Sequence, residues 1–341
     1  MPDIRCLVTG QTACYDQAGR EITCTGSGQD AEFHYGYSLP LLRFVVHGEL
    51  VEDRLTGLFW TRKANFATFP LSWQEALEYV QTMNQQQILG YSDWRLPNRR
   101  ELRSLMSYQT RKPSLPADNP FKEVFPGWYW TSTSAAISPD HAWYVHLEGA
   151  RMFYGGKDQS YLVWPVRGTD SGILPATGQQ YCYDDRGNRI VCTNSGQDGE
   201  YQLGSHWPCP RFKWRDDCVY DQLTNLCWYH NASLTDKPVT WCNALEAVHA
   251  LNHKSDGRHW HLPNINELES LVDSSQAKPA LPRQAPFKNV QDAYWSSTTS
   301  MFEPDWAWAL YMDKGAVGVG QKRGPYFFVW PVSITHTDSS V

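Results

Sequence analysis

Two short stretches of the chain carry apolar residues at helical spacing directly after a capping signal. In the first, Ser72 and Glu75 form a capping box, and apolar residues recur three or four positions apart over residues 76–83. In the second, Asn98 and Glu101 repeat the capping box ahead of another apolar face. The pattern predicts two short helices.

After these helices the pattern changes to aromatic and β-branched runs separated by glycines, which is typical of β-strands. The runs are "WYWTSTS" (128–134), "AWYVHLEG" (142–149) and "YLVWPV" (161–166). Nearer the start, "CYDQAGREITC" (14–24) places turn chemistry between two strand-like runs, which predicts a hairpin. The predicted fold class is α+β, with two short helices and a mostly antiparallel, strand-rich second half.

The same series of phrases occurs twice along the chain, in the same order. The matched pairs are 9–36 and 177–204 ("TGQ…CYD…C…SGQD"), 53–60 and 221–228 ("DRLTGLFW", "DQLTNLCW"), 129–134 and 294–299 ("YWTSTS", "YWSSTT"), and 163–166 and 329–332 ("VWPV"). A period of about 165 residues is far longer than a solenoid repeat and indicates a duplicated domain. We predict a first domain over 1–168, a second over 177–341, and a Gly-, Ser- and Pro-containing linker over 167–176.

Composition and charge exclude some classes of function. The chain is long enough for about two domains of ordinary size, and 41% of its residues are hydrophobic. A net charge of −6 argues against a general nucleic-acid binder. No apolar run approaches about 18 residues, so we expect no membrane span. The opening "MPDIRCLVTG" lacks the features of an export signal, so an exported form would be a mature or trimmed one.

Taken together, the ordered phrases resemble those of the Lcl C-terminal domain family. They include "D.LTGL.W", "DWRLPN..EL.SL", "YWTST" and a closing "WPVR", and the resemblance covers residues 9–168 and again 177–333. It implies two tandem C-type-lectin-like domains, of a kind found on secreted and surface bacterial proteins and linked in the namesake adhesin to sulfated glycans. It implies no catalytic residues.

The second copy departs from the first at the centre of its most characteristic phrase. Asp93 and Arg95 flank Trp94 in an extended segment, where alternate residues point to the same side. We expect the two charged residues to form a structural ion pair. In the second copy, where Trp260 takes the place of Trp94, both charged residues are replaced by histidine.

The histidines of the second copy raise the alternative of a metal site. Four of them lie close in sequence: His249, His253, His259 and His261. The first two stand at i, i+4 on a predicted helix, a spacing that suits a shared metal ion. Histidines on exposed helix faces are common, however, and no carboxylate is obviously placed to orient these. We therefore favour no metal and expect no cofactor.

The cysteines indicate an oxidising compartment. Cys14 and Cys24 have the same spacing as Cys182 and Cys192, in each copy across a predicted turn, which predicts two hairpin disulfides. Such bonds are typical of secreted, periplasmic or cell-surface proteins. Cys6 is left over, and either stays free or bridges to another chain.

Four further cysteines occur only in the second copy, at positions 209, 218, 227 and 242. We pair them as Cys209–Cys218 and Cys227–Cys242, because nearest neighbours close the shortest loops. Zinc is the competing interpretation, but the closely spaced cysteine pairs of zinc sites are missing.

The first copy alone has a concentration of positive charge. Its members lie in and after the second predicted helix: Arg99, Arg100, Arg103, Arg111 and Lys112. Such a cluster is most often a solvated helix surface, but arginine also suits sulfate and carboxylate groups, so these residues are candidates for binding acidic glycans. The chain's 16 tryptophans offer stacking surfaces, although those that recur at matched positions are expected in the core.

The sequence does not favour an enzyme, because it contains no nucleophile elbow, phosphate loop or HExxH motif. Two other hypotheses remain. The first is a glycan-binding or adhesin-like surface protein, with acidic glycans favoured at the first domain. The second is a structural subunit of an extracellular assembly that acts through protein–protein contacts. The expected partner is a glycan or another surface protein, not nucleic acid.

Overall fold

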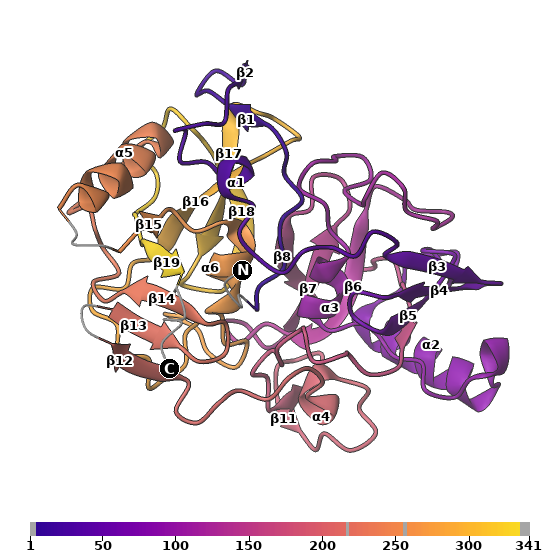
Figure 1. Ribbon diagram of the computed structural model, residues 1–341. Coiled ribbons are helices and arrows are strands. Elements are labelled where there is room, and N and C mark those ends of the chain that lie inside the picture. Colours follow the sequence, from indigo (N-terminus) through magenta and orange to yellow (C-terminus); the bar gives the residue numbers. More distant parts are fainter. Residues whose placement is uncertain (1–4, 216–217, 255–257, 335–341) are drawn as a thin grey trace, which may run out of the picture. The chain divides into compact units, whose positions relative to one another are not determined.

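The computed structural model describes residues 5–215, 218–254 and 258–334 (Figure 1). The chain divides into two compact units. The first-repeat unit contains Leu39–His206 and Asp273–Ala277, and the second-repeat unit contains Met1–Ser38, Trp207–Val272 and Lys278–Val341. These units follow contacts, whereas the predicted boundaries 1–168 and 177–341 follow the sequence repeat. The two divisions differ in where they place residues 1–38, 177–206 and 273–277.

The described part of the first-repeat unit contains two larger antiparallel sheets, a two-stranded hairpin and two capped helices. One sheet has the order β3 (Phe44–His47), β4 (Leu50–Asp53), β5 (Leu58–Thr61) and β9 (Val166–Arg167). In the other, β7 (His141–His146) pairs with both β6 (Trp128–Ser134) and β8 (Met152–Gly156). The helices are α2 (Trp73–Gln85) and α3 (Arg99–Ser104), and the short η1 (Ile88–Gly90) lies between them in sequence. The Leu39–His206 part of the unit ends with β10 (Cys182–Tyr183), β11 (Arg189–Ile190) and α4 (Asp198–Tyr201).

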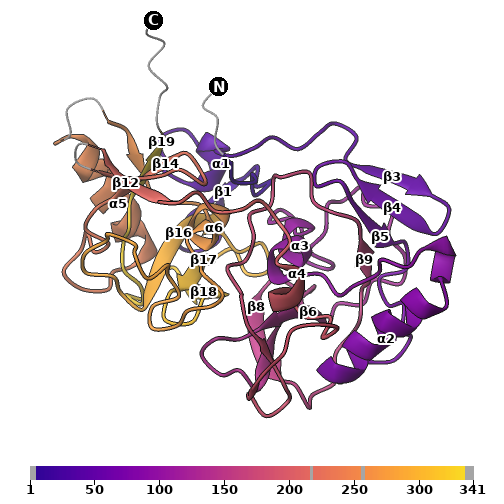
Figure 2. The ribbon, with the colours of Figure 1, turned by 90° about the horizontal axis from the view of Figure 1, so that it is seen from below.

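Local sequence signals account for both helices. The predicted capping boxes Ser72–Glu75 and Asn98–Glu101 are both present at the helix starts. The apolar face of α2 packs into a core that contains Trp73, as helical periodicity requires. In Figure 2, α2 lies on the same side of this unit as β9, and β8 lies on the other side.

The second-repeat unit repeats the meander, the two helices and the following strands in the same order, with β15 as an additional strand. Its sheets are β12 (Phe212–Arg215), β13 (Cys218–Asp221), β14 (Leu226–Tyr229), β19 (Val332–Ile334) and β15 (Trp260–His261), and then β16 (Ala293–Thr299), β17 (Trp306–Tyr311) and β18 (Ala316–Gln321). Its helices are α5 (Trp241–Asn252) and α6 (Ile265–Ser270). The N-terminal β1 (Cys14–Tyr15), β2 (Glu21–Ile22) and α1 (Asp30–Phe33) complete it, and Figure 1 shows α1 beside the β16–β18 strands.

The predicted α+β class with mostly antiparallel sheets is confirmed in both units. The strands are not confined to the second half of each repeat, because the β3–β5 and β12–β14 meanders precede the helices. Each meander turns around a buried aspartate: Asp53 accepts two hydrogen bonds from Arg43, at 2.9 and 2.8 Å, and Asp221 accepts the same pair from Arg211. The repeated "D.LT" phrase encodes this turn.

Tryptophans that recur in both repeats form the cores, as predicted. Every member of the matched pairs is at most 1% exposed: Trp60 and Trp228, Trp73 and Trp241, Trp130 and Trp295, Trp164 and Trp330. Trp94 and Trp260 are buried as well. Two tryptophans without a counterpart are exposed instead, Trp128 by 48% and Trp214 by 55%.

The predicted Asp93–Arg95 ion pair is wrong. Arg95 instead forms a buried bidentate pair with Glu101, with both N–O distances 2.7 Å, while Asp93 bonds the partly buried Arg167. Glu101 is the capping-box residue of α3, so Arg95 ties the extended segment to the helix start. In the second repeat His261 Nε2 lies 3.1 Å from both carboxylate oxygens of Glu267, so histidine substitutes for arginine on the same partner.

The hairpin disulfides Cys14–Cys24 and Cys182–Cys192 are both formed. The other two predicted bonds are wrong, because Cys209, Cys218, Cys227 and Cys242 form no disulfide. Strand register explains this: Cys218 pairs with Arg215 at one end of β12, whereas Cys209 precedes the other end. Cys227 hydrogen-bonds with Cys218 instead, which lowers the pKa of Cys227.

Two further predictions concern a membrane span and a bond from Cys6 to another chain. Within the described part of the chain, no helix is both long and apolar enough to cross a membrane. Cys6, which was predicted to be free or to bridge to another chain, is only 5% exposed, so its thiol is not presented to a second molecule.

Candidate functional site

The basic cluster of the first repeat does not form the exposed surface that the sequence predicts. Arg99, Arg100 and Arg103 are all buried, and so is every other residue of α3. The Arg99 guanidinium lies 4.2 Å from the ring centre of Trp143, and Arg103 donates to the Ala150 carbonyl and to the Tyr108 hydroxyl. Arg99 and Arg103 stabilise the interior, because the first stacks on a ring and the second donates to oxygens within the fold.

The other two members of the cluster, Arg111 and Lys112, are exposed. The Lys112 ammonium lies 3.2 Å from a carboxylate oxygen of Glu148, which offsets its charge. The structure therefore does not bring the five basic residues together as one anion-binding face.

The four histidines of the second repeat are divided between two roles. The rings of His249, on α5, and of His253, the residue that caps its end, are adjacent, with centres 4.7 Å apart, as their i, i+4 spacing predicts. His261 is buried against Glu267, and His259 is exposed. Among the described residues, no three His, Cys, Asp or Glu side chains gather in a group that could hold a metal ion.

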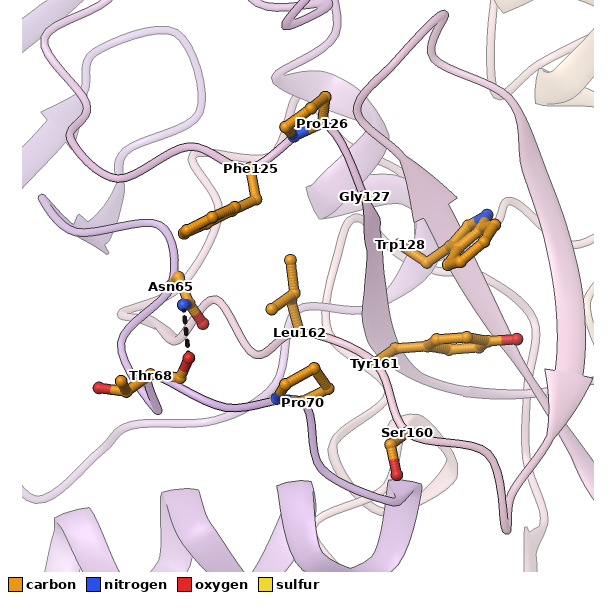
Figure 3. A pocket seen from close by; sticks show the side chains of 10 residues that line it. All are labelled: Asn65, Thr68, Pro70, Phe125, Pro126, Gly127, Trp128, Ser160, Tyr161 and Leu162. Atoms are coloured by element: carbon orange, nitrogen blue, oxygen red, sulfur yellow. Dashed lines mark hydrogen bonds between the residues drawn. The ribbon is translucent and has the colours of Figure 1, made fainter.

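The first-repeat unit contains an aromatic pocket of about 500 Å³ (Figure 3). Its walls are lined by Asn65, Thr68, Pro70, Phe125, Pro126, Gly127, Trp128, Ser160, Tyr161 and Leu162. Figure 3 shows Trp128 and Tyr161 on one side, Asn65 and Thr68 on the other, and Leu162 between them. Apolar walls with a few polar groups are the usual composition of a small-molecule site.

Strand β6, which begins at Trp128, holds this residue at the pocket. Trp128 pairs with His146 across the sheet and accepts a hydrogen bond on its carbonyl from Leu162 N at 2.9 Å. Its indole stacks on the His146 ring, with centres 5.2 Å apart and planes 25° apart. One indole face is therefore supported by the protein while much of the side chain stays exposed.

The neighbouring aromatic residues are fixed as well. Tyr161 lies with its ring centre 4.4 Å from that of Trp130 and 5.6 Å from that of Trp128, and its hydroxyl donates to Gln159 at 2.6 Å. The half-exposed Phe125 is anchored by its backbone N–H, which donates to the Tyr129 hydroxyl at 3.0 Å. A preformed wall of this kind loses little conformational entropy on binding.

The pocket wall carries no titrating charge near neutral pH. Burial raises the pKa of Tyr161 and lowers that of His146, so both rings stay neutral. The wall thus suits an uncharged ligand face.

Polar atoms at the opposite side give the pocket hydrogen-bonding capacity. Asn65 Nδ2 donates to the Thr68 carbonyl at 2.9 Å, which closes a tight turn, while Asn65 Oδ1 is buried and accepts no hydrogen bond from the described residues. Thr68 has a φ of 69°, a strained value for a β-branched residue. Backbone strain of this kind clusters at binding sites. The hydroxyls of Thr68 and Ser160 are on exposed residues at the rim.

The second repeat does not carry the same pocket residues. Strands β6 and β16 start at equivalent positions, but Ala293 stands where Trp128 stands and is buried. Gln291 replaces Phe125, because its backbone N–H donates to the Tyr294 hydroxyl as that of Phe125 donates to the Tyr129 hydroxyl, and Phe327 replaces Tyr161. The aromatic pocket is a feature of the first repeat.

Sequence reasoning missed this pocket because it sought charge. The pocket residues are spread over residues 65–162 and carry no motif. One signal was available: Trp128 has no counterpart in the second repeat, unlike the matched core tryptophans. A tryptophan that a duplicated core does not need has another reason to be present.

Comparison with known proteins supports the architecture described above. The profile of the Lcl C-terminal domain matches residues 49–167 and again residues 217–333, which together make up more than half of the chain. A search of curated proteins gave no match. The matched ranges begin in the first meander of each repeat and end with its closing strand, so they coincide with the two copies that the structure shows. The chain therefore belongs to the Lcl C-terminal domain family, with two copies of the domain in tandem.

Proposed function

We propose that this protein is a non-catalytic, secreted or surface-displayed glycan-binding protein, and that its first repeat binds a sugar ring in the aromatic pocket. The observation that carries the proposal is Trp128, whose 48% exposed indole borders a preformed pocket. The C–H face of a pyranose ring is apolar and packs against an indole, while its hydroxyls seek polar partners. Both kinds of group are present around this pocket.

Further observations support the extracellular setting. The two disulfides are the kind of bond that persists in oxidising compartments. Hydroxyls of a sugar at the rim of the pocket would meet the exposed Thr68 and Ser160. The proposal includes no preference for acidic glycans, because three of the five basic residues on which that preference rested are buried.

A glycan array probed with the full chain tests the proposal. The wild-type protein should bind a restricted set of glycans, and Trp128→Ala should weaken the affinity for them at least about tenfold, because the stacking surface is lost. Trp214→Ala is the matched control: this tryptophan is equally exposed but lies in the second-repeat unit, outside the pocket. Binding should survive in the control.

Two results would contradict the proposal. Binding that is undiminished by Trp128→Ala would place the glycan site elsewhere. A silent array with well-folded protein would favour the alternative, a structural subunit of an extracellular assembly.

A further inference from the structure

Each repeat is completed by a hairpin segment that the sequence repeat assigns to the other one. The first docking segment is residues 9–36, and the second is residues 177–204. Contacts group the first segment with the second repeat and the second segment with the first repeat. Helix α1 of the first segment contacts β16, and α4 of the second contacts β6.

The two segments use the same side chains for docking. In the second segment Gln179 accepts from Ser134 N and donates to Ser134 O, both at 2.8 Å. In the first segment Gln11 makes the same two bonds to Thr299, also at 2.8 Å. This reciprocal pair adds an extended piece of chain to the end of β6 or of β16.

A buried aspartate and a buried lysine repeat the correspondence. Thr133 donates to Asp198 at 2.7 Å, and Thr298 donates to Asp30 at 2.6 Å. In each unit a lysine then donates to two carbonyls of the docked hairpin: Lys157 to those of residues 183 and 184, and Lys322 to those of residues 15 and 16. The docking surfaces of the two repeats are thus chemically equivalent.

The fit of the hairpin turn is tight in both cases. A Cβ placed on Gly19 would lie 2.9 Å from Asp305 N, and one placed on Gly187 would lie 2.9 Å from Asp140 N. Both glycines also have a positive φ, near 80°. Any larger residue would therefore lift the turn from its surface.

The connector between the first docking segment and the first repeat is unusually apolar for exposed chain. It runs from Tyr37 to Arg43 outside the named strands and helices, with Leu41 fully exposed and Leu39 and Leu42 partly so. Three exposed leucines in four positions are a surface that a second molecule would cover. Exchange of identical elements between copies brings such connectors together.

We propose that the first docking segment is exchangeable, and that its partner is the second-repeat surface of another copy of this chain. Two chains then associate by inserting their N-terminal segments into each other. The contacts are the same within and between chains, so the equilibrium between the monomer and the exchanged dimer depends on the effective concentration of the chain's own segment. In wild-type protein at micromolar concentration the chain's own segment wins, and the monomer predominates.

Two full-length variants with complementary defects test this exchange. Gln11→Ala with Gly19→Val disables the segment and leaves the second-repeat surface intact. Thr298→Val with Lys322→Met disables the surface and leaves the segment intact. An equimolar mixture should form a one-to-one heterodimer by light scattering and native mass spectrometry. The segment-disabled variant alone, at the same total concentration, should stay monomeric.

A mixture of folded variants that stays monomeric would overturn the proposal. If either variant fails to fold, a second measurement decides. A specific protease site is placed between Leu41 and Leu42 of the otherwise unchanged chain, and the protein is cleaved after folding. The N-terminal fragment should remain bound and should exchange with an isotope-labelled copy from a second cleaved sample. Loss of the fragment at once, or no exchange over days, would contradict the inference.

Discussion

Trp128 in the first repeat and Ala293 in the second begin equivalent strands, yet one borders an open pocket and the other packs in the core. The rest of these two strands is matched residue by residue, and their buried tryptophans Trp130 and Trp295 are equivalent. A duplicated fold therefore keeps its interior while one copy changes a rim position. The difference locates where the first repeat can do something that the second cannot.

A second difference teaches the opposite lesson. Arg95 and His261 differ in charge and shape, but both bond the capping-box glutamate of the following helix. The role is preserved although the residue is not. Differences between the repeats therefore matter for function only where the partner changes as well.

The largest expected effect lies in what the repeats share. Trp130→Ala and Trp295→Ala should each lower the free energy of unfolding by about 3–5 kcal/mol, because each leaves a cavity in a closely packed core. Trp128→Ala should change it by less than about 1 kcal/mol, since the side chain is half exposed. Urea denaturation of the three variants makes the comparison. A large loss for Trp128→Ala would mean that Trp128 serves mainly to stabilise the fold.

The ion pair is next in size. Arg95→Ala should lower the free energy of unfolding by about 3 kcal/mol, because it leaves the buried Glu101 carboxylate without its guanidinium partner. Arg95→His should cost clearly less, since the second repeat makes the equivalent contact with histidine. Equal losses for the two variants, measured by urea denaturation at pH 6, would show that the repeats are not interchangeable at this position.

A smaller effect depends on pH and should be equal in the two repeats. Burial lowers the pKa of Lys157 and of Lys322 from 10.5 to about 7. Between these values the unfolded chain holds one more proton per lysine, so the free energy of unfolding rises as pH rises from 7. The slope is at most about 1.4 kcal/mol per pH unit for each lysine. Lys157→Met and Lys322→Met should each remove about half of the combined slope between pH 7 and 9. An unchanged slope in either variant would contradict the assignment.

Signals confined to neighbouring residues predicted the structure well. Both capping boxes, the Asp16–Gly19 turn and the two hairpin disulfides depend on groups a few positions apart, and all are present. The Cys209–Cys218 pairing failed because strand register, not loop length, decides which thiols meet.

Features set by the tertiary fold were out of reach. A run such as "NRRELRSL" resembles a solvated helix, and only the surrounding sheet and loops reveal that Arg99 and Arg103 stack on or donate to interior groups. The repeat itself could not say which copy of the docking segment completes which domain, because the two segments carry the same docking residues, such as Gln11 and Gln179. The aromatic pocket escaped for a related reason: Asn65, Trp128 and Tyr161 become neighbours only in the folded unit.

The central claim is that the first repeat binds a sugar against Trp128. It is tested most directly by following the indole N–H resonances of the full chain by NMR while the best array ligand is added, with the Trp128 signal assigned from Trp128→Phe. The account predicts that the Trp128 resonance shifts in a saturable way, while those of Trp214 and of the matched core tryptophans stay in place. A saturable shift at Trp214 with none at Trp128 would contradict it.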